Sequence, residues 1–77
     1  MPHVVVKMKA GRTEEQKRRL TEEITKDVIA ICNVAETSVS IAIEEFPRDQ
    51  WDSMVYEPEI LPSWDKLYKE PGYGRRP

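Results

Sequence analysis

The first two residues of the chain, Met1 and Pro2, place a secondary amine one cleavage away from the amino terminus. If Met1 is removed, Pro2 carries a free chain-terminal nitrogen on a rigid ring. Such a nitrogen titrates near pH 8 (about 7.7–8.0), far below a lysine, and is suited to act as a general base. The apolar residues that follow disfavour its charged form. The alternative interpretation is a proline that only permits Met1 removal and starts a strand.

Arg12 is the second residue with possible chemistry, because it lies just ahead of a predicted helix. A guanidinium beside the free backbone N–H groups of a helix start can hold a carboxylate or phosphate. The alternative is a solvated loop arginine. At about 3.3 Å per residue, Pro2 and Arg12 lie about 25–30 Å apart along the chain. One subunit cannot easily bring them together, so we expect a site shared with a two-fold partner.

Periodicity predicts the elements that position these two residues. Residues 3–9 alternate between two faces, which predicts a strand that starts directly after Pro2. Thr13 is followed three residues later by Gln16, a capping box that predicts a helix start. An apolar stripe at helical spacing extends this helix over about 18 residues. The stripe consists of Leu20, Ile24, Val28 and Ile31.

A second strand is predicted over residues 38–44, where β-branched residues alternate with small and polar ones. Strand, helix and strand form a β-α-β unit with parallel strands, so the predicted fold class is α+β. One helix on a two-stranded sheet leaves an edge and a face uncovered, and such a sheet is not stable alone. The smallest solution is a homodimer with a four-stranded sheet and two helices on one face.

The chain changes character after Phe46. Residues 47–51 indicate a turn or a short helical turn. A second apolar stripe predicts a carboxyl-terminal helix, with Pro58 suited to its start and Pro62 to a restart or kink. The stripe consists of Ile60, Leu61, Trp64, Leu67 and Tyr68. We expect this helix to cover the bare sheet surface, and residues 73–77 to form a disordered tail.

Length and composition fit one small domain, residues 1–77. The net charge of −2 and the scattered basic residues predict no nucleic-acid binding. No apolar run approaches the about 18 residues of a membrane span, and the amino terminus lacks a secretory signal pattern. The single cysteine, Cys32, forms no internal disulfide and is expected to pack in the core. We therefore expect a cytoplasmic protein without membrane contact, metal or other cofactor.

Three stretches of the chain resemble the 4-oxalocrotonate tautomerase superfamily. They are PHVVVKMKAGRTEEQK at residues 2–17, TSVSIAIEEF at residues 37–46, and the aromatic residue Trp51. The longer carboxyl-terminal part is similar to the dimeric bacterial subgroup of that superfamily. The resemblance implies the β-α-β fold of tautomerases and MIF, a homodimer, and a cofactor-free isomerase that interconverts keto and enol groups.

The resemblance also implies a role for each matched residue. Pro2 is implied as the general base that moves a proton between the oxygen and the carbon of an enol. Arg12 is implied to bind a substrate carboxylate from a neighbouring subunit, and Trp51 matches a Phe that makes the pocket apolar. Ser40 departs from the pattern, because the hexameric relatives carry a second Arg there that polarises the 2-keto oxygen. Among small 2-keto or enol acids, this departure favours phenylpyruvate over the diacid 2-hydroxymuconate.

Two other functions stay open on the sequence alone. A non-catalytic dimeric module could bind a small carboxylate on the same scaffold, consistent with Ser40 in place of the second Arg. A hydratase or dehalogenase relative needs a carboxylate that activates water, and Asp52 is the available one. Enol turnover that is lost in Pro2→Ala distinguishes a tautomerase from a binding module, and loss of water addition in Asp52→Ala identifies a hydratase or dehalogenase.

Overall fold

Two parallel strands form the sheet of this protein. The computed structural model describes residues 1–77. β1 (His3–Lys9) lies beside β2 (Ser40–Phe46), and they pair over their full length, first residue opposite first and last opposite last. The first strand is confirmed as predicted. The second begins later than predicted because the preceding residues form a short 3₁₀ turn, η1 (Glu36–Ser38).

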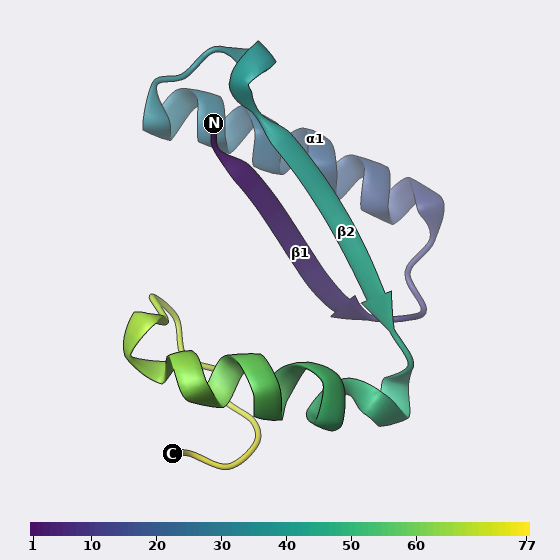
Figure 1. The fold of residues 1–77 in the computed structure, drawn as a ribbon. Coiled ribbons are helices and arrows are strands. Elements are labelled where there is room, and N and C mark those ends of the chain that lie inside the picture. The colour runs from purple at the N-terminus through teal and green to yellow at the C-terminus, as the bar shows by residue number, and fades with distance from the viewer.

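α1 (Glu14–Cys32) connects the strands and lies across one face of the sheet (Figure 1). The predicted capping box is present. The Thr13 hydroxyl accepts from the Gln16 backbone N–H at 3.0 Å, and the Gln16 side chain accepts from the Thr13 N–H at 2.9 Å. The helix ends at Asn33, whose φ of 57° is left-handed, a conformation that asparagine tolerates. The predicted β-α-β unit is thereby confirmed.

The last turn of α1 contributes nothing to a core. Ile31 is 82% exposed and Cys32 is also exposed, so the expectation that Cys32 packs in the core is wrong. Figure 1 shows the physical reason, because the end of α1 extends past the start of the sheet. The earlier residues of the apolar stripe are half-buried; they are Leu20, Ile24 and Val28.

The predicted carboxyl-terminal helix is present, but it begins earlier than predicted. A 3₁₀ turn, η2 (Arg48–Gln50), leads into the π-helix η3 (Asp52–Ile60), which continues as the 3₁₀ helix η4 (Leu61–Lys66). Pro58 therefore lies inside η3 rather than at its start. Proline has no N–H, so Pro58 donates no backbone hydrogen bond within η3. Pro62 lies in the first turn of η4, at the predicted restart.

The sheet face opposite α1 stays largely open. Val5 on this face is 44% exposed. The carboxyl-terminal segment approaches the face near the end of β2, where Trp51 meets Phe46 edge-on with 6.1 Å between ring centroids. Further along the chain, Glu59 of η3 pairs with Lys7 of β1, and a cleft of about 360 Å³ lies between Val5 and the carboxyl-terminal segment. The helix therefore lies over part of the bare sheet surface but does not pack tightly on it, so the expectation that it covers this surface is met only in part.

The buried residues lie in the carboxyl-terminal segment. Val55 and Tyr56, both in η3, are the only fully buried residues, at 3% and 1% exposure. None of the helices is long and apolar enough to cross a membrane. Within one protomer, the apolar side chains between α1 and the sheet are only half-buried.

Candidate active site

The structure places the four predicted site residues in two pairs at opposite ends of the sheet. Pro2 and Ser40 lie together at the amino end of the strands, where the Ser40 N–H donates to the Pro2 carbonyl at 3.2 Å. Arg12 and Trp51 lie at the carboxyl end, where both line one cleft. The length of β1 separates the two pairs. No single protomer therefore brings Pro2 and Arg12 together, as their spacing in the sequence predicted.

At the amino end, Ser40 is engaged within its own chain. Its hydroxyl lies 2.7 Å from Nδ1 of His3, the residue opposite it in the sheet. The Met1 amine donates to the Ser38 carbonyl, and with Met1 in place the Pro2 nitrogen is an amide without basicity. Proton transfer by Pro2 thus requires removal of Met1, and a ligand can use the Ser40 hydroxyl only by sharing it with His3.

The cleft at the carboxyl end has a volume of about 340 Å³ and is rich in cations. Its lining residues are Lys7, Met8, Lys9, Arg12, Arg48, Trp51 and Tyr73. No acidic side chain is among them, although the chain carries a net charge of −2. Neither Arg12 nor Arg48 takes part in an ion pair. A local concentration of positive charge of this kind attracts anionic ligands.

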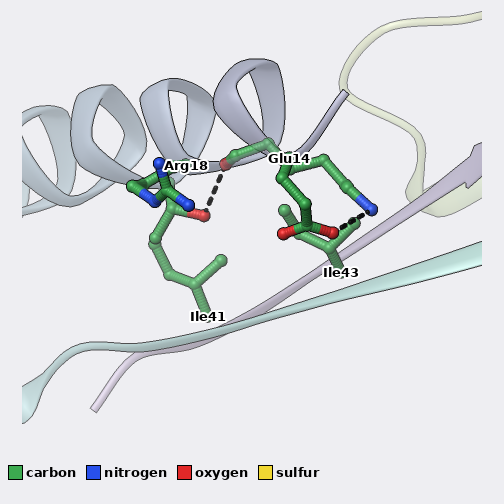
Figure 2. A pocket seen from close by; sticks show the side chains of 6 residues that line it. Glu14, Arg18, Ile41 and Ile43 are labelled. Atoms are coloured by element: carbon green, nitrogen blue, oxygen red, sulfur yellow. Dashed lines mark hydrogen bonds and ion pairs between the residues drawn. The ribbon is translucent and has the colours of Figure 1, made fainter. Parts of the chain in front are cut away.

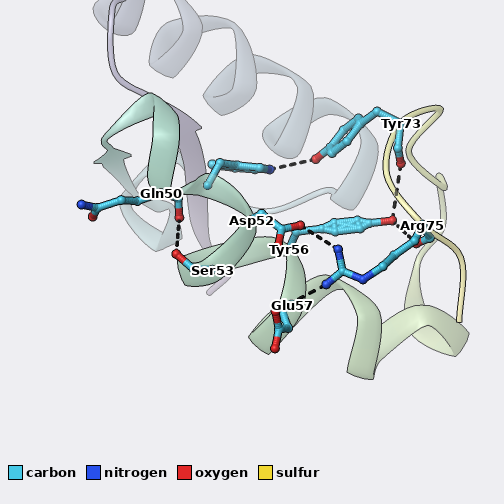
Figure 3. Close-up of polar contacts among 8 residues, drawn as sticks. Gln50, Asp52, Ser53, Tyr56, Glu57, Tyr73 and Arg75 are labelled. Carbon is cyan, nitrogen blue, oxygen red and sulfur yellow. Dashed lines mark hydrogen bonds and ion pairs between the residues drawn. The ribbon is translucent and has the colours of Figure 1, made fainter.

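Trp51 forms the aromatic wall of this cleft and is fixed on two sides. Its ring meets the Phe46 ring at an angle of 79°, and its indole N–H donates to the Tyr73 hydroxyl at 3.0 Å (Figure 3). Because the Tyr73 oxygen accepts this bond, its own O–H is available as a donor. The wall therefore combines an apolar surface with a hydroxyl group.

Tyr73 reaches the cleft because the carboxyl-terminal tail folds back on η3. The Tyr56 hydroxyl donates to the Arg75 carbonyl, and the Arg75 side chain pairs with Asp52 at 2.9 Å (Figure 3). The hydrogen bond and the charge of Asp52 raise the pKa of Arg75. Gly74 has a φ of 79°, and a Cβ there would lie 2.6 Å from the Tyr56 ring. The tail is therefore bound to η3 rather than disordered as predicted.

Asp52, the carboxylate considered for a hydratase or dehalogenase, does not line the cationic cleft. Its carboxylate binds the guanidinium of Arg75 instead. The lining of the cleft thus contains no carboxylate that could activate water.

Five residues of the cleft were not predicted from the sequence as part of a site: Lys7, Met8, Lys9, Arg48 and Tyr73. A signal for Arg48 was available, since parallel strands end at the same edge of a sheet. A cation shortly after β2 must lie near the turn that follows β1. No local pattern places Tyr73, because its position depends on tertiary contacts of the tail.

Two further clefts fit the predicted site less well. The larger, about 390 Å³, lies between α1 and β2 (Figure 2) and contains none of the predicted site residues. The positive charge of its lysine is balanced by two acidic side chains. Hydrogen bonds to Glu45 at 2.8 Å and to Glu14 at 2.9 Å raise the pKa of Lys17. The third cleft, about 360 Å³, is mostly apolar and shares Lys7 and Trp51 with the cationic cleft. The cationic cleft is therefore the candidate site.

Comparison with protein families matches residues 2–53 to the family described as tautomerase enzyme. A probable tautomerase of Xylella fastidiosa is 33% identical over 75 residues, which cover 97% of this chain and 92% of the relative. Tautomerase PptA of Klebsiella pneumoniae is 39% identical over 74 residues, which cover 95% of this chain and 97% of the relative. The similarity to these named tautomerases thus extends over nearly the full length.

Solved structures share the β-α-β fold. YwhB, a homologue of 4-oxalocrotonate tautomerase, is 44% identical with a TM-score of 0.61, over 62% of this chain and 79% of that chain. A heterohexameric 4-oxalocrotonate tautomerase from Chloroflexus aurantiacus is 29% identical with a TM-score of 0.64, over 66% and 82%. The family match ends at residue 53, so most of η3, all of η4 and the tail lie beyond it.

Proposed function

The chain belongs to the tautomerase family of enzymes, and from this premise we propose that it is a cofactor-free keto–enol tautomerase with Pro2 as its general base. The proposed substrate is a small 2-keto or enol carboxylate, of the kind represented by phenylpyruvate and 2-hydroxymuconate. The observation that carries the proposal is the acid-free cleft lined by Arg12 and Trp51. It offers a cation for a carboxylate beside an aromatic wall.

We further propose that a second copy of the chain completes the site in a homodimer. One protomer buries only two residues, and both edges of its two-stranded sheet are unpaired. If β1 pairs antiparallel with β1 of the partner, the start of one strand lies beside the end of the other. The partner subunit's Pro2 then lies next to the turn that holds Arg12. Pairing through β2 instead would move Pro2 about 10 Å further from that turn, since two strand spacings intervene.

In this arrangement the reaction is a proton transfer without loss or gain of atoms. The neutral Pro2 amine takes the proton of the enol hydroxyl, the carbonyl forms, and the same nitrogen returns a proton to the carbon. Arg12 holds the carboxylate, and the Trp51 ring limits access of water. A positioned base of this kind contributes about 10²–10⁴-fold to the rate, and the cations of the cleft stabilise the negative charge that develops on the enolate.

The test follows the ultraviolet absorbance of enol-phenylpyruvate and 2-hydroxymuconate with protein whose loss of Met1 is established by intact mass spectrometry. The wild type is expected to accelerate ketonisation above buffer, and Pro2→Ala to lose about 10²–10⁴-fold of that rate. Full activity in Pro2→Ala would reject Pro2 as the base. Carboxylate binding without any turnover would identify a binding module instead of an enzyme.

A further inference from the structure

Arg48 lies in the cationic cleft, and the proposed reaction assigns it no contact of its own with the substrate. It is the first residue of η2, and its Nη1 donates to the Ala10 carbonyl at 3.3 Å. A Cβ placed on Gly11 would lie 3.5 Å from the same nitrogen. The Arg48 guanidinium therefore rests on the turn after β1, and the next residue along that turn is Arg12.

The positive charges of Arg48 and Arg12 have no acidic partner in the cleft. The protein has 14 acidic residues, yet none of them lines this site. Lys7, in the same cleft, is by contrast held by Glu59. Two guanidinium groups beside one turn repel each other, and a ligand that brings one carboxylate to each of them relieves this repulsion. A ligand that carries negative charge into the cleft therefore stabilises the arrangement.

We propose that Arg48 is a second anion-binding residue of the substrate cleft, acting beside Arg12. The inference rests on the proposed function and adds to it a second positive charge that comes from η2. Ser40 cannot supply this charge, because it is neutral, lies at the other end of β1 and is engaged by His3. The cleft consequently selects ligands with two carboxylates over otherwise identical ligands with one.

Binding rather than turnover provides the direct test. Muconate and sorbate share one flat six-carbon diene, which suits the Trp51 wall, and differ in a single carboxylate. Isothermal titration calorimetry with the full chain is expected to give at least about tenfold tighter binding of muconate, as a second charge-assisted contact predicts. Arg48→Gln should remove most of this preference, because it weakens muconate binding far more than sorbate binding. Arg48→Lys should keep part of it, because the charge remains.

Arg19→Gln is the matched control, since Arg19 is an exposed arginine on α1 outside the three clefts. It should bind both ligands as the wild type does. Equal weakening of both ligands in Arg48→Gln, or an unchanged preference, would overturn the role of Arg48. Circular dichroism of Arg48→Gln verifies that the variant is folded. These titrations do not depend on Pro2. A dicarboxylate preference without enol turnover would therefore reject the tautomerase proposal and leave the binding role of Arg48 in place.

Discussion

The indole N–H of Trp51 donates to the Tyr73 hydroxyl at 3.0 Å, and this bond joins the wall of the cationic cleft to the carboxyl-terminal tail. Trp51 lies inside the residues matched to the tautomerase family, whereas Tyr73 lies beyond them. The tail is therefore part of the cleft rather than an appendage. Its attachment to η3 holds Tyr73 at the wall of the cleft.

Tyr73→Phe removes this bond and keeps the ring. A net loss of about 0.5–1.5 kcal/mol in the free energy of unfolding is expected, the usual contribution of one hydrogen bond. Urea denaturation followed by tryptophan fluorescence measures it. Tyr68→Phe is the matched control, because the Tyr68 side chain is fully exposed and forms no hydrogen bond. Equal stability of the two variants would show that the Trp51–Tyr73 bond does not fix the tail.

Gly74→Ala is expected to detach the tail. The φ of 79° is unfavourable for any residue with a Cβ, and that Cβ would lie 2.6 Å from the Tyr56 ring. Strain and overpacking together predict a loss of about 2 kcal/mol or more in the free energy of unfolding. Gly72→Ala is the control, because a Cβ there meets nothing within 4 Å. Thermal denaturation should rank wild type and Gly72→Ala together, well above Gly74→Ala.

The elements predicted correctly are those whose signals are local. The capping pair of Thr13 and Gln16 and the alternation of residues 3–9 each specify their element through neighbours a few residues apart. The sequence predicts the start of the second helix too late, because proline is favoured in the first turn of an α-helix and Pro58 therefore suggests a start there. The structure has Pro58 inside η3, which already begins at Asp52.

The candidate site was predictable in part for the same reason. The separation of Pro2 from Arg12 follows from counting residues along a strand, and the structure has the two at opposite ends of β1. The position of Arg48 near the turn after β1 is also predictable, because the ends of parallel strands meet at one edge of a sheet. The position of Tyr73 is not, because the fold-back of the tail depends on a buried Tyr56 and on an ion pair with Asp52.

The contact between α1 and β2 should depend on pH through Lys17. Hydrogen bonds to Glu45 and Glu14 raise the pKa of Lys17 above 10.5. The stabilisation of the folded state by the charged Lys17 is therefore complete below pH 10.5 and is lost as the pH rises further. Lys17 lowers the pKa of Glu14 below 4.5. The stabilisation of the folded state by the charged Glu14 is therefore present above pH 4.5 and is lost as the pH falls. The cluster is therefore intact across the neutral range.

Lys17→Met tests this dependence, since it keeps the aliphatic stem and removes the charge. Urea denaturation should show a lower free energy of unfolding than in the wild type at neutral pH, with a gap that narrows well below pH 4.5. Lys26→Met is the control, because the Lys26–Glu23 pair is exposed and 3.5 Å long, and such pairs contribute little. A gap for Lys17→Met that does not change with pH would exclude the ion pairs as its cause.

A site shared between subunits makes a quantitative prediction for mixed dimers. Pro2→Ala keeps Arg12, and Arg12→Ala keeps Pro2, so each variant alone has only defective sites. A mixed dimer has one site with both residues intact and one site with both replaced. Refolding the variants together in equal amounts makes about half of the dimers mixed, so about one quarter of wild-type activity is expected.

The outcome separates a shared site from one built within a single protomer. If Pro2 and Arg12 of the same chain acted together, mixing would only average two defective proteins, and activity would not exceed the mean of the unmixed variants. Refolding Pro2→Ala with the double variant Pro2→Ala/Arg12→Ala is the control, because no combination of these chains restores Pro2. Activity in that control would point to Pro2-independent turnover. Recovery only in the first mixture requires that Pro2 of one chain reach Arg12 of the other, as antiparallel pairing of the β1 strands predicts.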